Sequence, residues 1–123
     1  MRFTGVGREG LIDMDDSEFA RISAQVLARI EATVDTWLQD DVIDIDGHRT
    51  GGLLELSFPN GSKVVVNTQP PLHELWLAAR SGGYHFRWVD GVWRDTRGGD
   101  EFFAALSREL SLQAGKELVL TAA

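Results

Sequence analysis

The chain has 123 residues, of which 43% are hydrophobic and 25% charged, a composition typical of one globular domain. It has no cysteine, which excludes disulfides, thiolate metal sites and cysteine nucleophiles. The net charge of −7 and the pI of about 4.8 argue against a nucleic-acid partner, because phosphate binding needs a basic surface. No apolar run approaches the ~20 residues of a membrane span, and no secretion signal opens the chain. We therefore expect a soluble protein of the cytoplasm with no membrane partner.

The first thirteen residues are rich in glycine and show no hydrophobic periodicity. Residues 5–10 match the dinucleotide-binding pattern GxGxxG, but a strand must precede that motif and only four residues are present to form one. We therefore expect residues 1–13 to be a flexible leader outside the domain, and residues 14–123 to form a single domain.

A long helix is predicted from about Asp16 to about Gln39. Asp15, followed three residues later by Glu18, resembles a capping box. Apolar residues then recur at steps of three and four, which makes one buried stripe. The stripe consists of Phe19, Ile22, Val26, Ile30, Val34 and Trp37.

Acidic residues are concentrated in the stretch from Asp13 to Asp46. It holds ten of the nineteen carboxylates and two arginines, a balance of −8, so the rest of the chain sums to +1. Glu31 and Asp35 are four residues apart on the helix, where like charges repel. Clustered carboxylates suit hard cations such as Mg²⁺, Ca²⁺ or Mn²⁺, or a basic protein patch. The spacing is not that of an EF-hand, and a merely solvated acidic face remains an alternative.

An antiparallel sheet is predicted to follow, because short alternating runs are separated by turn residues. We expect strands at residues 42–46, 53–58, 63–67, 72–78, 84–89 and about 92–94. We expect turns at residues 47–52, 59–62, 81–83 and 90–91, with residues 69–71 interrupting the pairing at two prolines.

A second helix should begin near Asp100 as its N-cap and end at Gly115. Its buried stripe would be Phe102, Phe103, Leu106 and Leu110, and the tail Leu118, Val119 and Leu120 should pack on the helix pair. The order of helix, strands and helix predicts an α+β fold. It would be a two-layer α/β sandwich, with an antiparallel sheet and both helices on one face.

The other face of this sheet should be polar. Its expected residues are Glu55, Ser57, Lys63, Asn67, Glu74, Trp76, His85 and Arg87. Trp76 stands out there, either as an anchor for a partner or as a ring covered by a long side chain such as Arg87. The three histidines lie in different elements and lack zinc spacing, and no catalytic triad is readable, so we expect no enzyme.

Residues 51–88 resemble the frataxin family, in particular its bacterial members. The motifs that match in order are Asn60-Gly61-Ser62, Asn67-Thr68-Gln69-Pro70-Pro71, Leu75-Trp76-Leu77 and Ser81-Gly82-Gly83-Tyr84-His85-Phe86. The opening Asp16-Ser17-Glu18-Phe19 and the later Gln113-Ala114-Gly115 also fit. The resemblance covers about Met14 to the C-terminus.

The resemblance implies a frataxin-like fold and weak binding of Fe²⁺ or Fe³⁺, with other divalent cations also accommodated, on an acidic ridge. Carried over residue by residue, the acidic ridge is Asp16, Glu18, Glu31, Asp35, Asp40, Asp41, Asp44 and Asp46. The ridge is thinner than in some bacterial relatives, because Ala20, Ala32, Thr36, Leu38 and Val42 stand where those relatives can carry histidine or acidic residues.

The implied role is non-enzymatic regulation of, or iron supply to, iron–sulfur cluster assembly. The implied partners are a cysteine desulfurase and an iron–sulfur scaffold protein, contacted on the sheet surface by Asn67, Gln69, Trp76 and His85. We expect a monomer, with iron-driven oligomers as an open question. Two alternatives remain: a ferroxidase or iron-storage assembly, and a protein-binding module without a metal function.

Overall fold

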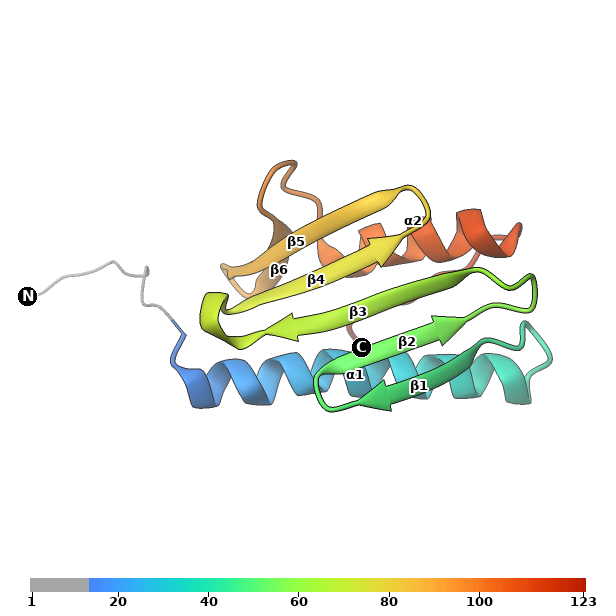
Figure 1. Cartoon of the computed structure of the whole chain (residues 1–123), viewed down its shortest axis with the longest axis horizontal. Coiled ribbons are helices and arrows are strands. Elements are labelled where there is room, and N and C mark those ends of the chain that lie inside the picture. The colour runs from blue at the N-terminus through green and yellow to red at the C-terminus, as the bar shows by residue number, and fades with distance from the viewer. Residues whose placement is uncertain (1–13) are drawn as a thin grey trace, which may run out of the picture.

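Every strand of the sheet pairs with its neighbours in the sequence, so the strand order is β1-β2-β3-β4-β5-β6 and all pairs are antiparallel. The computed structural model describes residues 14–123. The expected leader and its GxGxxG match lie outside these residues. Both helices cover the same face of the sheet (Figure 1), which confirms the predicted fold class. The elements are α1 Asp16–Gln39, β1 Asp46–Thr50, β2 Leu53–Ser57, β3 Lys63–Gln69, η1 Pro70–Leu72, β4 Glu74–Ala79, β5 Gly82–Val89, β6 Val92–Asp95 and α2 Phe102–Ala114.

The first helix begins and ends where the sequence predicts. The Asp15 carboxylate accepts a hydrogen bond from the backbone N–H of Glu18 at 2.7 Å, which satisfies one free donor of the first turn. The predicted apolar stripe is buried, except that Trp37 at its end is half-buried. No helix among the described residues combines the length and apolar character that a membrane crossing requires.

The first strand was predicted at the wrong place. Residues 42–45 are an extended connection, and β1 occupies residues 46–50, which were expected to turn. The apolar alternation at residues 42–45 reflects packing, because Ile45 is buried there without a strand partner. All five residues of β1 are exposed, so this edge strand lacks the apolar signal by which strands are recognised. Its main chain still pairs with β2, and His48 lies opposite Glu55.

Smaller differences have local causes. β4 begins at Glu74 because residues 70–72 form a 3₁₀ turn that ends in the left-handed conformation of His73, with φ of 53°. The N-cap of α2 is Glu101 and not Asp100, since the Glu101 carboxylate accepts the N–H groups of Phe103 and Ala104 at 2.8 and 3.1 Å. β3 and β5 extend beyond the predicted runs, to Gln69 and from Gly82.

The core lies between the sheet and the two helices. The inward residues of the strands are fully buried against the apolar stripes of α1 and α2; they are Leu54, Leu56, Val64, Val66, Leu75, Leu77 and Phe86. The C-terminal tail packs on this layer as predicted, with Leu118 and Leu120 buried and Val119 turned outward at 63% exposure. The tail is held by Ser111, whose hydroxyl donates to the Leu118 carbonyl at 3.0 Å.

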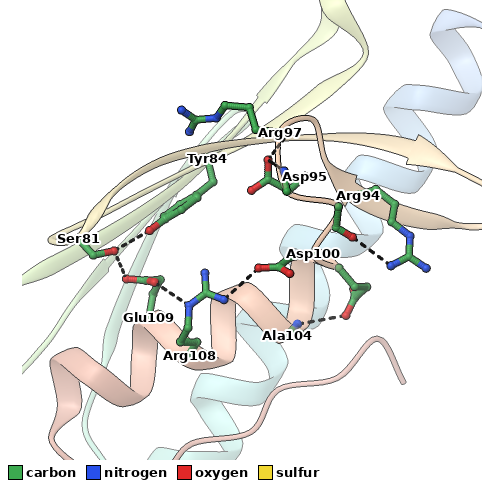
Figure 2. A network of polar contacts seen from close by, with 12 residues as sticks. Ser81, Tyr84, Arg94, Asp95, Arg97, Asp100, Ala104, Arg108 and Glu109 are labelled. Carbon is green, nitrogen blue, oxygen red and sulfur yellow. Dashed lines mark hydrogen bonds and ion pairs between the residues drawn. The ribbon is translucent and has the colours of Figure 1, made fainter.

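A polar network fastens α2 to the turn between β4 and β5 (Figure 2). Glu109 is buried, and its carboxylate accepts from the Ser81 hydroxyl at 2.6 Å and from Arg108 Nε at 3.1 Å. Arg108 also donates to Asp100 at 3.2 Å, and its guanidinium lies 5.9 Å from the centre of the Tyr84 ring. The buried charge is therefore paired, which is the condition for tolerating it.

Gln113 makes a second polar connection, one helical turn after Glu109 and near the end of α2. Its side chain is 4% exposed and donates to the Ser62 hydroxyl at 3.0 Å and to the Lys63 carbonyl at 3.1 Å. The side-chain oxygen accepts from the Arg80 N–H at 2.9 Å, and the Gln113 carbonyl accepts from Asn60 at 2.7 Å. One residue thus joins the helix to the β2–β3 and β4–β5 turns.

We predict that Gln113→Leu lowers the free energy of unfolding by about 1–3 kcal/mol, because it leaves a backbone donor and an acceptor unpaired. Urea unfolding measures the loss. The neighbouring Leu112→Ala is the control, since Leu112 is 66% exposed, and it should change the value by less than about 0.5 kcal/mol. Equal effects of the two changes would contradict the role given to Gln113.

Candidate functional site

The acidic ridge is distributed along α1 and the segment that follows it. Four of its members lie on α1, three in the connection to β1 and one at the start of β1; they are Asp16, Glu18, Glu31, Asp35, then Asp40, Asp41, Asp44, then Asp46. A helix of 24 residues is about 36 Å long. Asp16 and Glu18 therefore lie far from Asp40, and the ridge is a surface and not one site.

The ridge carboxylates do not form a metal cage. Across residues 14–123, no three His, Cys, Asp or Glu side chains come close enough together to hold a metal ion. A hard cation with six or more oxygen ligands would have to keep most of its water here. The geometry fits exposed contacts through one or two carboxylates.

Two ridge carboxylates already have a basic partner. Arg49 Nη1 lies 2.9 Å from Glu31 Oε1, and His73 Nε2 lies 2.7 Å from Asp16 Oδ1. Neither pair was predicted. For the first pair the reason is that Arg49 was assigned to a turn. It lies in β1, where its position in the register places it on the helix side of the sheet. The His73 ring also stacks on Phe19 with 5.1 Å between centroids.

The other six ridge carboxylates have no such partner among the described residues, and four of them are aspartates on the last turns of α1 and in the connection after it. Within the part of the chain that the structure describes, no basic group lies within 4.0 Å of Asp35, Asp40, Asp41 or Asp44, and all four are exposed. The last turn of α1 has no basic residue, and Asp40 is its C-cap. Negative charge is unfavourable at this end of a helix dipole, by about 0.3–1 kcal/mol for each group near the last turn. A cation bound there would relieve that cost.

Lys116 approaches the same segment without neutralising it. Its ammonium donates to the Val42 carbonyl at 2.6 Å, so it fixes the connection between α1 and β1. Asp41 adopts the left-handed conformation with φ of 59°, which turns the chain out of the helix. The tail therefore holds the segment in place and leaves its carboxylates in solvent.

The four predicted partner-binding residues come together on the open face of the sheet. Asn67 on β3 lies opposite Trp76 on β4, which lies opposite His85 on β5. Gln69 donates to the Asn67 side chain at 3.0 Å and completes the row. The rings of Trp76 and His85 stack at 4.1 Å with 4° between their planes. His85 therefore covers one face of the Trp76 ring, and Trp76 is half-buried.

Glu74 organises this row and was not predicted to do so. It lies on the solvent side of the sheet, yet it is only 6% exposed. Its Oε1 accepts from Trp76 Nε1 at 2.9 Å, and its Oε2 accepts from Arg87 Nε at 2.9 Å. Burial by itself raises the pKa of the Glu74 carboxyl, but the hydrogen bonds from Trp76 and Arg87 and the charges of Arg87 and His85 outweigh it and lower the pKa. An ionised carboxylate thus fixes the indole and the guanidinium together.

Comparison with known proteins places the chain among close relatives. A family model described as a frataxin-like domain matches residues 12–116. The iron–sulfur cluster assembly protein CyaY of Burkholderia mallei (strain SAVP1) is 50% identical over 109 residues, 89% of this chain and 100% of that protein. The protein of that name from Paraburkholderia phymatum is 53% identical over 103 residues, 84% of this chain and 94% of the relative.

Solved structures give the same grouping. Frataxin from Psychromonas ingrahamii aligns with a TM-score of 0.77 at 36% identity, covering 88% of this chain and 99% of that one. A trimeric frataxin from the yeast Saccharomyces cerevisiae, described as complexed with ferrous ion, aligns with a TM-score of 0.65 at 23% identity. It covers 85% of this chain and 90% of its own, and at that identity the similarity supports the fold alone.

We predict that Glu74→Gln lowers the free energy of unfolding at pH 7 by about 1–3 kcal/mol, because hydrogen bonds to a charged group are lost. The carboxyl pKa is lower in the folded than in the unfolded state. The stabilisation is therefore present above the unfolded pKa of about 4.3 and is lost as the pH falls through the folded value. Urea unfolding of both proteins from pH 7 to pH 3 should show the difference narrowing with acid.

Glu55→Gln is the matched control for this measurement. Glu55 pairs with Lys63 at 3.3 Å on the same face, but its side chain is 35% exposed. An exposed pair is worth no more than about 1 kcal/mol. A Glu74→Gln difference that stayed constant with pH would mean that packing, and not the ionised carboxylate, is responsible.

Proposed function

The chain belongs to the frataxin-like family, as its motifs predicted, and from that premise we propose that it serves iron–sulfur cluster assembly without being an enzyme. It would bind iron weakly on the acidic ridge and dock on a cysteine desulfurase and its scaffold protein. The observation that carries the proposal is the group of four exposed aspartates, Asp35, Asp40, Asp41 and Asp44, that have no basic partner among residues 14–123. The bacterial relatives that this chain matches over their full length are named iron–sulfur cluster assembly proteins.

Iron is the proposed cargo of the ridge. Fe²⁺ and Fe³⁺ accept carboxylate ligands, and other divalent cations with oxygen preferences would compete. Weak binding follows from the exposure of the carboxylates and from the lack of a cage among the described residues. Glu31 and Asp16 are paired internally, so we assign them a weaker role in binding iron. We assign the strongest role to the four aspartates without a basic partner among the described residues, which are Asp35, Asp40, Asp41 and Asp44.

Docking is proposed at two surfaces. The ridge would meet a basic patch of the desulfurase, where opposite potentials raise the association rate and set the orientation. The row of Asn67, Gln69, Trp76 and His85 would meet the scaffold, with Trp76 as an aromatic anchor. Glu74 supports this assignment, because it fixes the indole before binding and so reduces the entropy lost on docking.

The proposal also covers the domain organisation, the oligomeric state and the cellular location of the protein. Residues 14–123 would act as one domain and a monomer in the bacterial cytoplasm, with residues 1–13 as a leader. Oligomers driven by iron would be a secondary state.

A ferroxidase or iron-storage assembly is the alternative function. It needs redox turnover of iron or growth of the assembly on iron loading. Equal rates of Fe²⁺ oxidation with and without the protein, together with a monomer by gel filtration after iron loading, would remove this alternative.

We predict that Fe²⁺ added without oxygen broadens the backbone amide signals of residues 35–44 more than those of β4 and β5. Paramagnetic broadening falls steeply with distance, so ¹⁵N spectra locate the ion. The triple variant with Asp40→Asn, Asp41→Asn and Asp44→Asn should lose most of the effect, because three ligand carboxylates are neutralised. Lack of broadening in the native protein would favour a docking module without a metal function.

We also predict that the double reversal Glu31→Lys and Asp35→Lys abolishes capture by a cysteine desulfurase at low ionic strength, because it replaces two negative charges of the ridge with positive ones. A pull-down with purified proteins measures the loss. Retained capture would show that the ridge is not the interface.

The control carries the same change in net charge elsewhere. Asp90→Lys and Glu117→Lys alter exposed residues outside the ridge, and this variant should still be captured.

Arg49→Gln increases the negative charge that the ridge can offer, because it frees Glu31 from its internal partner. Capture of this variant by the desulfurase should be more sensitive to salt than capture of the native protein.

A further inference from the structure

Two arginines face each other on the open side of the sheet, at the edge away from the acidic ridge. Arg87 on β5 and Arg94 on β6 are directly paired in the strand register, and both are exposed. Like charges placed opposite each other across two strands destabilise a sheet. Glu74 offsets the charge of Arg87, but Arg94 has no carboxylate partner among residues 14–123, so an anion placed between the two guanidinium groups would relieve the remaining repulsion.

Internal contacts satisfy the two guanidinium groups only in part. Arg87 donates Nε to Glu74 while its side chain remains 61% exposed, and within the described residues its terminal nitrogens have no recorded hydrogen bond. Arg94 donates to the Gly99 carbonyl at 3.2 Å. Among residues 14–123 no carboxylate lies within 4.0 Å of Arg94. The nearby Asp95 instead accepts the Arg97 N–H at 2.8 Å.

A hollow opens beside this pair. Its volume is about 360 Å³, and its lining residues are Glu74, Arg87, Val89, Arg94, Asp95 and Thr96. Glu74 belongs to its wall and is neutralised by Arg87. The hollow therefore adjoins the Trp76 and His85 row. It offers the exposed Arg94 guanidinium, the Arg87 guanidinium and a threonine hydroxyl to a ligand. The Asp95 carboxylate also lies in the lining, where it accepts the backbone N–H groups of Arg97 and Gly98.

We propose that Arg87 and Arg94 form an anion-binding pair that takes a carboxylate-bearing segment of a protein partner. A guanidinium presents a planar fork of donors that matches a carboxylate with two hydrogen bonds. Two such groups opposite one another suit consecutive acidic side chains better than a single small anion. The polar and aromatic row next to the pair supplies the remaining contact area.

The position of the pair would orient the partner. The ridge follows α1 and β1, whereas Arg87 and Arg94 lie on β5 and β6 (Figure 1). Four strand spacings separate β1 from β5, which is about 19 Å. A partner that offers a basic patch to the ridge and an acidic segment to the pair can bind in one orientation only. The identity of that partner rests on the proposed function, but the anion site is a property of the isolated protein.

The test is an NMR titration with a synthetic hexa-glutamate peptide as the probe. We expect saturable shifts of the Nε–H signals of Arg87 and Arg94 and of the Trp76 indole N–H. Arg94→Gln should weaken binding about tenfold or more, because charge-assisted bonds are lost. Arg94→Lys should weaken it less, since it keeps the charge and loses the fork. Arg80→Gln, at an exposed arginine of the β4–β5 turn, should bind like the native protein.

Three outcomes would overturn the proposal. They are no shifts with hexa-glutamate, equal affinity of the native protein and Arg94→Gln, and inorganic phosphate giving the same shifts at the same concentration. The third would mean an adventitious ion only. Arg94→Gln removes a single hydrogen bond to Gly99, so its unfolding midpoint should stay close to native, and a melting curve verifies that it folds.

Failure here is distinguishable from failure of the proposed function. In one case, hexa-glutamate gives no shifts, while a desulfurase captures the native protein and not the variant with Glu31→Lys and Asp35→Lys. The proposed function would then stand, and the arginine site would be ruled out. Hexa-glutamate binding without any desulfurase capture would leave the site standing and remove the assembly partner.

Discussion

One-sided burial of the sheet is the constraint on which the rest of this structure depends. The central inward residues of β2 to β5 are buried against the apolar stripes of α1 and α2, and the two layers together form the core. Since successive strand residues point to opposite faces, the residues between them must face solvent together. The open face is therefore a direct consequence of the core. Any function that needs a rigid, flat and polar surface can use it without disturbing the packing beneath.

Glu74 determines how the side chains around it on the open face are arranged. A carboxylate that is 6% exposed on a solvent-facing surface would be costly without donors. Trp76 and Arg87 provide them from the same and the neighbouring strand, and both oxygens are used. These hydrogen bonds offset the cost of desolvating the carboxylate, and they also restrict the Trp76 and Arg87 side chains to one arrangement. Trp76, His85 and Arg87 then form a surface that is ordered before any partner arrives.

The parts that could be predicted from the sequence are those that depend on periodicity. The bounds of α1, the hairpin at residues 59–62 and the buried stripe of α2 follow from local patterns, and the structure confirms them. β1 could not be predicted, because every residue in it is exposed and it pairs only through its main chain. The pairing of Arg49 with Glu31 and the burial of Glu74 depend on strand register, which a single sequence does not reveal. The positions of the charges were therefore predictable, but their internal partners were not.

The internal partners of the ridge carboxylates relate the stability of the fold to the cation binding that we propose at the ridge. Arg49 pairs with Glu31 and His73 contacts Asp16, whereas the aspartates of the last turns of α1 and the connection after it have no basic partner among the described residues and lie near the negative end of the helix dipole. These aspartates repel one another and the last carbonyls of the helix, so the folded state is strained there by charge. The unfolded chain separates the charges and removes the strain. A cation that binds only the folded arrangement would therefore stabilise it by RT ln(1 + [L]/Kd), which remains small until the free concentration exceeds Kd. Weak affinity for the proposed cation would follow from the same geometry, because a tighter cage would require these carboxylates to converge on one point, and among the described residues they do not.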